Sequence, residues 1–271
     1  MFKEFFKSIY YFTYQLFLSR YFLFRLYHSG KVTLFDKKNF KFFSQYIRNK
    51  NDLNTLRQIF IKEEYKFERN INRSIYSKYK NITDDKKIPL IIDCGANICA
   101  SVNYFYLNFP KAEIVGIEPD EINYDLCKKN NLNNKKIKIL NRALSNERFV
   151  YSLERKSQDG RSSFIKYEKN EINENKLPKT IIMEDVILNY NINKYTPFLI
   201  KIDIEGHEKK LFESNTDWMK YFKIIIIELH DWMLPNENIS ETFYKALKEN
   251  LINYEIYNFG ENTLVINKLK L

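Results

Sequence analysis

The feature that most constrains this chain is a pair of apolar strands, each of which ends in an acidic residue. The run IIDCGANICAS spans residues 91–101, and its strand ends at Asp93, just before Gly95. A second apolar run, VGIEP at residues 115–119, ends at Glu118. A strand, a tight Gly turn, a helix and a second strand ending in an acid form the βαβ unit that binds ribose-bearing cofactors. The sequence therefore predicts a Rossmann-like α/β fold.

The composition of the turn indicates which cofactor fits this unit. Gly95 is the only glycine between Asp93 and Ser101, so the turn lacks the G-x-G-x-x-G pattern of dinucleotide sites. A pyrophosphate needs several unobstructed backbone N–H groups, which disfavours NAD and FAD. S-adenosylmethionine carries no phosphate, and Asp93, Gly95 and Glu118 offer it a close approach and carboxylates for the ribose. The alternative is that Asp93 caps the next helix and Glu118 is a solvated strand end.

Positive charge is concentrated in the first third of the chain. Residues 1–80 contain 17 Lys and Arg against 6 Asp and Glu, and the whole chain has a net charge of +10. A basic, aromatic segment favours an anionic partner, such as a membrane face, a phosphorylated or nucleotide-linked glycan, or nucleic acid. The alternative is a merely solvated helical face.

The three cysteines indicate the redox environment. Cys94, Cys99 and Cys127 form neither a C-x-x-C pair nor a metal-finger spacing. We therefore expect a reducing compartment, with the thiols unpaired and packed in the core.

We divide the chain into a basic, aromatic-rich helical extension at residues 1–87 and a catalytic domain at residues 88–271. Residues 1–30 are expected to form a buried docking helix, or else an interfacial membrane helix. Their longest charge-free run has 12 residues, which is short of the roughly 20 that a membrane-spanning helix needs.

The catalytic domain shows alternating strand and helix patterns. Strands are expected at residues 88–93, 113–118, 136–144, 197–203 and 223–229, with helices at 100–108, 122–130, 184–189, 210–219 and 240–249. Residues 149–167 are typical of an inserted hairpin, and residues 254–267 of a closing antiparallel hairpin. Four consecutive isoleucines from Ile224 indicate a strand that is covered on both faces.

Four segments in this order resemble the FkbM family of S-adenosylmethionine-dependent methyltransferases. They are DCGAN at residues 93–97, Glu118 with Pro119, KIDIEGHE at 201–208 and the strand at 224–228. The resemblance covers about residues 88–267 and implies a class I methyltransferase sheet of seven mostly parallel strands with an antiparallel last strand. It further implies a cofactor site formed by Asp93, Gly95, Ala96, Asn97, Glu118, Pro119, Ala143, Leu144 and Asp203. Cys99 stands where family members usually carry Gly, which would narrow the pocket.

The carboxyl ends of the predicted strands also hold candidate catalytic groups. A hydroxyl acceptor needs a general base, and His230 is our candidate, with Asp231 or Glu228 to orient it. His207 also follows a strand. Asp203 with Glu228 or His230 could bind Mg²⁺, the alternative being turn and cap roles for these acids. Lys201, inside a strand, should pair with a carboxylate.

We therefore expect an O-methyltransferase that acts on a sugar or phosphorylated sugar in bacterial surface-glycan biosynthesis. The expected catalytic residues are His230, Asp203 and Glu228, and Arg161 could meet an anionic group of the acceptor. We expect a cytoplasmic location, extending to the inner face of the membrane through residues 1–30, and leave a homo-oligomer open. Nucleic acid is not expected, because no N-P-P-Y or D-P-P-Y tetrad follows the fourth strand. The alternatives are a non-catalytic scaffold with a vestigial pocket, or a phosphate-type, amine or nucleic-acid acceptor.

Overall fold

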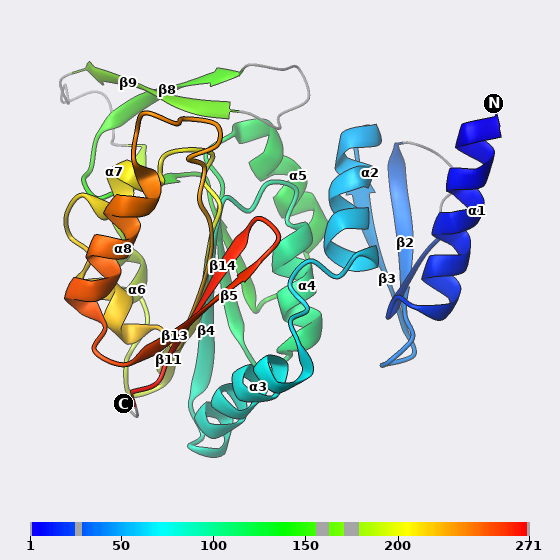
Figure 1. The fold of residues 1–271 in the computed structure, drawn as a ribbon, viewed down its shortest axis with the longest axis horizontal. Helices are drawn as coiled ribbons and strands as arrows, with labels where there is room; N and C mark the ends of the chain where they lie inside the picture. Colours follow the sequence, from blue (N-terminus) through cyan, green and yellow to red (C-terminus); the bar gives the residue numbers. More distant parts are fainter. Residues whose placement is uncertain (1, 25–28, 156–162, 171–178, 270–271) are drawn as a thin grey trace.

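The computed structural model describes residues 2–24, 29–155, 163–170 and 179–269. The centre of the fold is a sheet of seven strands (Figure 1) in the order β13-β14-β12-β11-β4-β5-β6. Five neighbouring strands of this sheet run parallel to one another. They are β4 (Ile88–Cys94), β5 (Glu113–Ile117), β6 (Ile137–Leu140), β11 (Tyr195–Ile202) and β12 (Ile224–Glu228). Strand β14 (Asn262–Asn267) runs antiparallel between β12 and β13 (Tyr254–Phe259). The predicted sheet and its closing hairpin are confirmed.

Both faces of the sheet are covered, because alternate residues of the central strands point into two separate hydrophobic clusters. In β12, Ile224 and Ile226 belong to one cluster, and Ile225 and Ile227 to the other. Figure 1 shows α6, α7 and α8 on one side of the sheet and α3, α4 and α5 on the other. Their bounds are α3 Arg69–Asp84, α4 Ala100–Asn108, α5 Glu121–Asn131, α6 Met183–Leu188, α7 Glu208–Phe212 and α8 Ile239–Asn250.

Two predicted elements of this domain are divided in the structure. The expected strand at residues 136–144 ends at Leu140, and β7 (Ala143–Leu144) pairs instead with β10 (Thr180–Ile181). Asn141 turns the chain there by donating hydrogen bonds to the carbonyls of Glu118 and Pro119. The expected helix at 210–219 is replaced by α7 and the 3-10 turn η2 (Asp217–Tyr221), since Asn215 takes a left-handed φ of 55°.

The inserted hairpin is present as β8 (Val150–Arg155) paired with β9 (Ser163–Asn170). The tip of the hairpin, with Arg161, lies outside the described residues.

The N-terminal extension is only partly helical. It contains α1 (Phe2–Phe17), α2 (Lys50–Leu56), the π-helical turn η1 (Arg57–Ile61) and α3. Between α1 and α2, the strands β1 (Tyr21–Phe24), β2 (Gly30–Asp36) and β3 (Lys41–Ile47) form an antiparallel sheet. The helical prediction is wrong there because the apolar residues alternate. Val32 and Leu34 are buried while their neighbours Thr33 and Phe35 are more exposed, which is the period of a strand.

The first helix is not a buried docking helix over the residues whose burial is described. Tyr10, Phe12, Leu16 and Phe17 are exposed, and Tyr14 is a partly buried residue that packs against the core. The strongly apolar residues of this helix lie on one side of it, and Phe12, Leu16 and Phe17 on that side are exposed, so this apolar face is not packed against the core. Among the described residues, no helix is long and apolar enough to cross a membrane.

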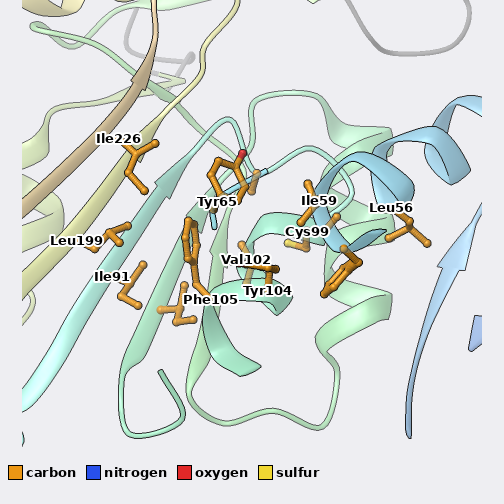
Figure 2. Close-up of a cluster of buried hydrophobic side chains, with 14 of the residues drawn as sticks. Leu56, Ile59, Tyr65, Ile91, Cys99, Val102, Tyr104, Phe105, Leu199 and Ile226 are labelled. Carbon is orange, nitrogen blue, oxygen red and sulfur yellow. The ribbon is translucent and has the colours of Figure 1, made fainter. Parts of the chain in front are cut away.

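The extension and the sheet share one hydrophobic core. Figure 2 shows Leu56, Ile59 and Tyr65 of the extension in one cluster with Val102, Tyr104 and Phe105 of α4. The sheet residues Ile91, Leu199 and Ile226 lie to the left in this view. The extension is therefore fixed against the face of the sheet that carries α4.

Cys99 and Cys127 are joined as a disulfide, and their Cα atoms lie 5.0 Å apart. The prediction of three unpaired thiols is therefore wrong for this pair, and Cys94 is the free, buried cysteine. The spacing of 28 residues matched no sequence motif, because the pairing depends on α4 and α5 lying side by side. The disulfide ties the start of α4 to α5.

Candidate functional site

Two adjoining cavities lie at the carboxyl ends of the parallel strands, the edge where open α/β sheets bind ligands. The first has a volume of about 70 Å³ and the second about 350 Å³. Both are lined by Gly95, Asn97, Asp203 and Glu205. A ligand could therefore extend from one cavity into the other past these residues.

The first cavity holds most of the residues predicted to bind the cofactor. It is lined by Gly95, Asn97, Ile117, Glu118, Pro119, Asn123, Ala143, Leu144, Asp203, Ile204 and Glu205. Ala96 lines the second cavity instead. The buried Ala143 and Leu144 supply an apolar surface in this cavity, as an adenine slot requires.

Gly95 is required by the packing of the turn. Its φ is +83°, and a Cβ atom there would lie 1.7 Å from the carbonyl oxygen of Asp203. The turn therefore lies against the end of β11 with no room for a side chain, and this close approach shapes the floor between the two cavities.

Glu118 is buried at the end of β5 and accepts two backbone hydrogen bonds. Its Oε2 accepts from Asn97 N at 2.7 Å, and its Oε1 accepts from Asp120 N at 3.0 Å. Burial raises the pKa of Glu118 to about 7, although these bonds oppose the shift. The carboxylate thus connects the Gly turn to the second strand and faces the first cavity.

Asp93 lies beneath the cavities and is fully buried. Lys201 Nζ lies 3.2 Å from Asp93 Oδ1 and 3.3 Å from Asp203 Oδ2, and it donates to the Gly95 carbonyl at 2.9 Å. The prediction that Lys201 pairs with a carboxylate is confirmed. Asp93 lines neither cavity, so its described role is to hold Lys201 under the turn, and a direct contact with a cofactor stays a prediction.

The second cavity brings the three predicted catalytic residues together. His230 Nε2 lies 3.8 Å from Asp203 Oδ1 and 3.5 Å from Glu228 Oε1. On the other side of the ring, Nδ1 lies 2.9 Å from Glu208 Oε1. The ring is therefore held at Nδ1, and Nε2 faces the carboxylates that line the cavity.

The residue that orients His230 is Glu208, so the prediction of Asp231 or Glu228 is wrong. Glu208 is fully buried at the start of α7, where it also accepts a hydrogen bond from Ile204 N. Asp231 turns away and accepts from Ser240 N at 3.1 Å, at the start of α8. Glu208 is the last residue of the KIDIEGHE segment, and no local pattern indicated that its side chain would contact His230, which follows β12.

Acidic neighbours determine the protonation of this group. Burial by itself lowers the pKa of His230, but the hydrogen bond and charge of Glu208 and the charges of Asp203 and Glu228 raise it to about 9. Burial and the charge of Asp203 raise the pKa of Glu228 to about 8. By contrast, burial lowers the pKa of His207 to about 3, and its ring contacts Ser145 Oγ at 3.2 Å, outside both cavities.

Asp203, Glu228 and His230 could also hold a metal ion. One ligand atom from each of them lies within 4.8 Å of the others. Two carboxylate oxygens and an imidazole nitrogen suit a divalent cation, although Mg²⁺ prefers oxygen ligands alone.

The N-terminal extension forms one wall of the second cavity. Thr55, Gln58, Ile59, Glu64 and Tyr65 line it, opposite Trp232 and Met233. Its carboxylates are Glu64, Asp203, Glu205, Glu228 and Glu261. This lining is rich in hydrogen-bond acceptors and repels an anionic group placed inside it. The part played by the extension was not visible in the sequence.

The sheet order, the antiparallel β14 and a pocket floored by a Gly turn between acid-tipped strands define a class I methyltransferase. Residues 93–259, more than half of the chain, match the methyltransferase FkbM domain. The chain therefore belongs to the FkbM methyltransferase family, which confirms the resemblance seen in the sequence.

Solved structures with a similar fold share little sequence with this chain. The methyltransferase domain of METTL16 is 12% identical with a TM-score of 0.42, covering 74% of this chain and 67% of that one. The pre-rRNA processing protein fibrillarin from Methanococcus jannaschii is 10% identical with a TM-score of 0.40, covering 68% of each chain. The bifunctional kinase-methyltransferase WbdD is 12% identical with a TM-score of 0.38, covering 74% of this chain and 40% of that one. No curated protein matches the sequence.

Proposed function

We propose that this methyltransferase uses S-adenosylmethionine to methylate a hydroxyl group of a carbohydrate. The observation that carries the proposal is the pairing of a cofactor-type cavity with a second cavity in which an oriented histidine is surrounded by carboxylates. Family membership supports the cofactor, and the lining of the second cavity supports the acceptor class.

The residues of the first cavity fit the cofactor. Ala143 and Leu144 would contact the adenine, the Glu118 carboxylate would accept hydrogen bonds from the ribose hydroxyls, and the space beside Gly95 would take the methionine portion. Cys99, which stands at the start of α4 where the family usually has Gly, is fully buried and lines neither cavity. When bound, the cofactor supplies an electrophilic methyl group on its sulfonium.

His230 would act as the general base. With Nδ1 held by Glu208, Nε2 is the atom that can take the proton of an acceptor hydroxyl. Glu228 and Asp203, both close to Nε2, would accept hydrogen bonds from neighbouring hydroxyls and so orient the acceptor. A metal ion at these three residues, Mg²⁺ in the sequence-based expectation, would orient the same hydroxyls, but the proposal does not require one.

The lining of the second cavity favours a sugar. Hydroxyl groups are hydrogen-bond donors that suit carboxylates, and Trp232, which is 70% exposed beside His230, offers an apolar surface for the face of a sugar ring. A phosphate of a phosphorylated sugar would have to remain outside this acidic cavity. Bacterial surface glycans are the acceptors we favour.

Calorimetric titration with S-adenosylhomocysteine tests the cofactor half of the proposal. We expect Glu118→Ala to weaken binding by about tenfold or more, since a buried acceptor of hydrogen bonds is lost. Glu121→Ala is the matched control, because Glu121 lies nearby on α5 and lines neither cavity. Absence of binding by the unaltered chain at millimolar ligand would refute the cofactor site.

Transfer of labelled methyl groups to glycan fractions tests the acceptor half. We expect His230→Asn to abolish turnover while the affinity for S-adenosylhomocysteine is retained. Cofactor binding without transfer to any glycan would instead favour the scaffold alternative, and transfer to amines or nucleic acid would replace the carbohydrate assignment.

A further inference from the structure

A third cavity, of about 750 Å³, lies between the N-terminal extension and the sheet, and methyl transfer does not use it. Its walls come from the β1–β2 side of the extension, from the start of α3, from α4 and from β11 and β12. Its volume is in the range of cavities that hold small organic ligands.

The polar part of this cavity is strongly basic. It is lined by one carboxylate, Glu63, and by the cations Arg20, Lys37, Lys38, Lys66, Arg69 and Arg73. Arg20 is neutralised by Asp36 at 2.6 Å, and Lys66 by Glu63 at 2.8 Å.

The other four cations are not neutralised by any carboxylate that the structure describes. Lys37 Nζ donates only to the backbone carbonyls of Gln15 and Leu16, which do not neutralise it. Lys38, Arg69 and Arg73 have no ion pair with any carboxylate in the part of the chain that is described. Four like charges around one cavity attract an anion of more than one charge, such as a phosphate.

The floor of the cavity is apolar. Figure 2 shows Tyr65, Tyr104, Phe105, Leu199 and Ile226, all of which line it. Leu199 and Ile226 belong to the central sheet and are 1% exposed, so the cavity extends inward from its basic rim to the core. A small, fully polar anion would leave this floor uncovered, whereas an apolar chain would fill it.

Exposed apolar residues lie next to the basic rim. Leu16, Phe17 and Leu18 are 46%, 77% and 69% exposed, and Lys37 is bonded to the carbonyl of Leu16. Apolar side chains beside lysines are typical of surfaces that contact anionic lipids.

We propose that this cavity is a binding site for an anionic amphiphile, in which a phosphate is held by Lys37, Lys38, Arg69 and Arg73 and an attached apolar chain lies on the floor of the cavity. A membrane phospholipid and a lipid-phosphate carrier share this chemistry. The site is separate from the cofactor cavity and does not depend on the identity of the methyl acceptor.

Titration of the full chain with inorganic phosphate, butyl phosphate and octyl phosphate tests the site. We expect affinity to rise with chain length, and the neutral octyl glucoside to bind at least about tenfold more weakly than octyl phosphate. Equal affinity for inorganic and octyl phosphate would overturn the assignment of the apolar floor.

The double variant Arg69→Gln/Arg73→Gln should weaken octyl phosphate binding about tenfold or more. Its matched control is Lys245→Gln/Lys248→Gln on α8, which removes the same charge from exposed positions outside the cavity. Unchanged affinity for S-adenosylhomocysteine shows that both double variants are folded. An equal loss of octyl phosphate affinity in the two double variants would show that only the net charge of the protein matters, and would contradict the proposed site.

Sedimentation with vesicles distinguishes the two sources of the amphiphile. Binding to phosphatidylglycerol vesicles but not to phosphatidylcholine vesicles, lost in Arg69→Gln/Arg73→Gln, would identify a membrane phospholipid. Binding of octyl phosphate without vesicle binding would identify an extracted lipid-phosphate carrier. Absence of both kinds of binding would overturn the proposal.

Discussion

At the scale of single residues, Gly95 has the least tolerance for change. A methyl group there would overlap the Asp203 carbonyl, and the φ of +83° disfavours any side chain. We expect Gly95→Ala to cost about 2–4 kcal/mol of unfolding free energy and to abolish cofactor binding. Urea unfolding and titration with S-adenosylhomocysteine measure both effects.

Gly260→Ala is the control for this prediction. Gly260 also has a positive φ, but a Cβ atom there would meet nothing within 4 Å. Gly260→Ala should therefore lower the unfolding free energy by only about 1–2 kcal/mol, the cost of a left-handed backbone conformation for a residue with a side chain. Equal costs at the two glycines would show that the contact with Asp203 does not matter.

Glu208 should control the protonation of His230. Removing its charge by Glu208→Gln leaves less to oppose the effect of burial, so the pKa of His230 should fall from about 9. An NMR titration of the imidazole, assigned through His230→Asn, measures the shift.

In the unaltered enzyme, methyl transfer should increase as the pH rises through about 9, because the base must lose its proton. A profile that is flat up to this pH would exclude His230 as the base.

Individual residues differ in how far the sequence could predict them. The lining of the first cavity was predictable because Gly95, Glu118 and Asp203 stand at strand ends, and parallel strand ends meet at one edge. The roles of Glu208 and Tyr65 were not predictable. Glu208 contacts His230, which is 22 residues away in the sequence, and Tyr65 reaches the second cavity from the N-terminal extension. The position of Asp93 beneath the turn, paired with Lys201, was not visible in the motif either.

At the scale of elements, β4, β5 and β12 were predictable from continuous apolar runs that end in acids. The three strands of the extension were not recognised, although Val32 and Leu34 alternate with more exposed neighbours. The adjacent Phe42 and Phe43 on opposite faces of β3 masked the alternation of that strand, and no Pro or Asn-Gly turn marked the hairpin.

The link between α4 and α5 leads to a second stability prediction. Cys127→Ser opens a loop of 28 residues, and the unfolded chain then gains conformational freedom. We expect a loss of about 2–4 kcal/mol of unfolding free energy. Reducing agent should lower the stability of the parent protein by a similar amount and leave the variant unchanged. A thiol assay in denaturant without reductant should find only Cys94, and three reactive thiols would contradict the disulfide.

At the scale of the whole molecule, buried acids should make stability depend on pH. Burial raises the pKa of Glu118 and Glu205 to about 7 and that of Glu228 to about 8. Between their ordinary pKa and these values, the folded chain binds more protons than the unfolded chain, so stability falls as pH rises. We expect the free energy of unfolding to decrease as the pH rises from about 5 to about 8.

Urea unfolding at several pH values measures this dependence, and Glu228→Gln should make it shallower. A stability that stayed constant over the same range would show that these acids ionise as easily in the folded chain as in the unfolded one.

One wall of the second cavity lies upstream of residues 93–259, the segment that matches the FkbM domain. This wall is formed by Thr55, Gln58, Ile59, Glu64 and Tyr65. In the proposed function, the choice of acceptor would therefore depend on this wall as well as on the matched segment. Exchanging residues 93–259 between two relatives would then transfer the chemistry but not the choice of acceptor.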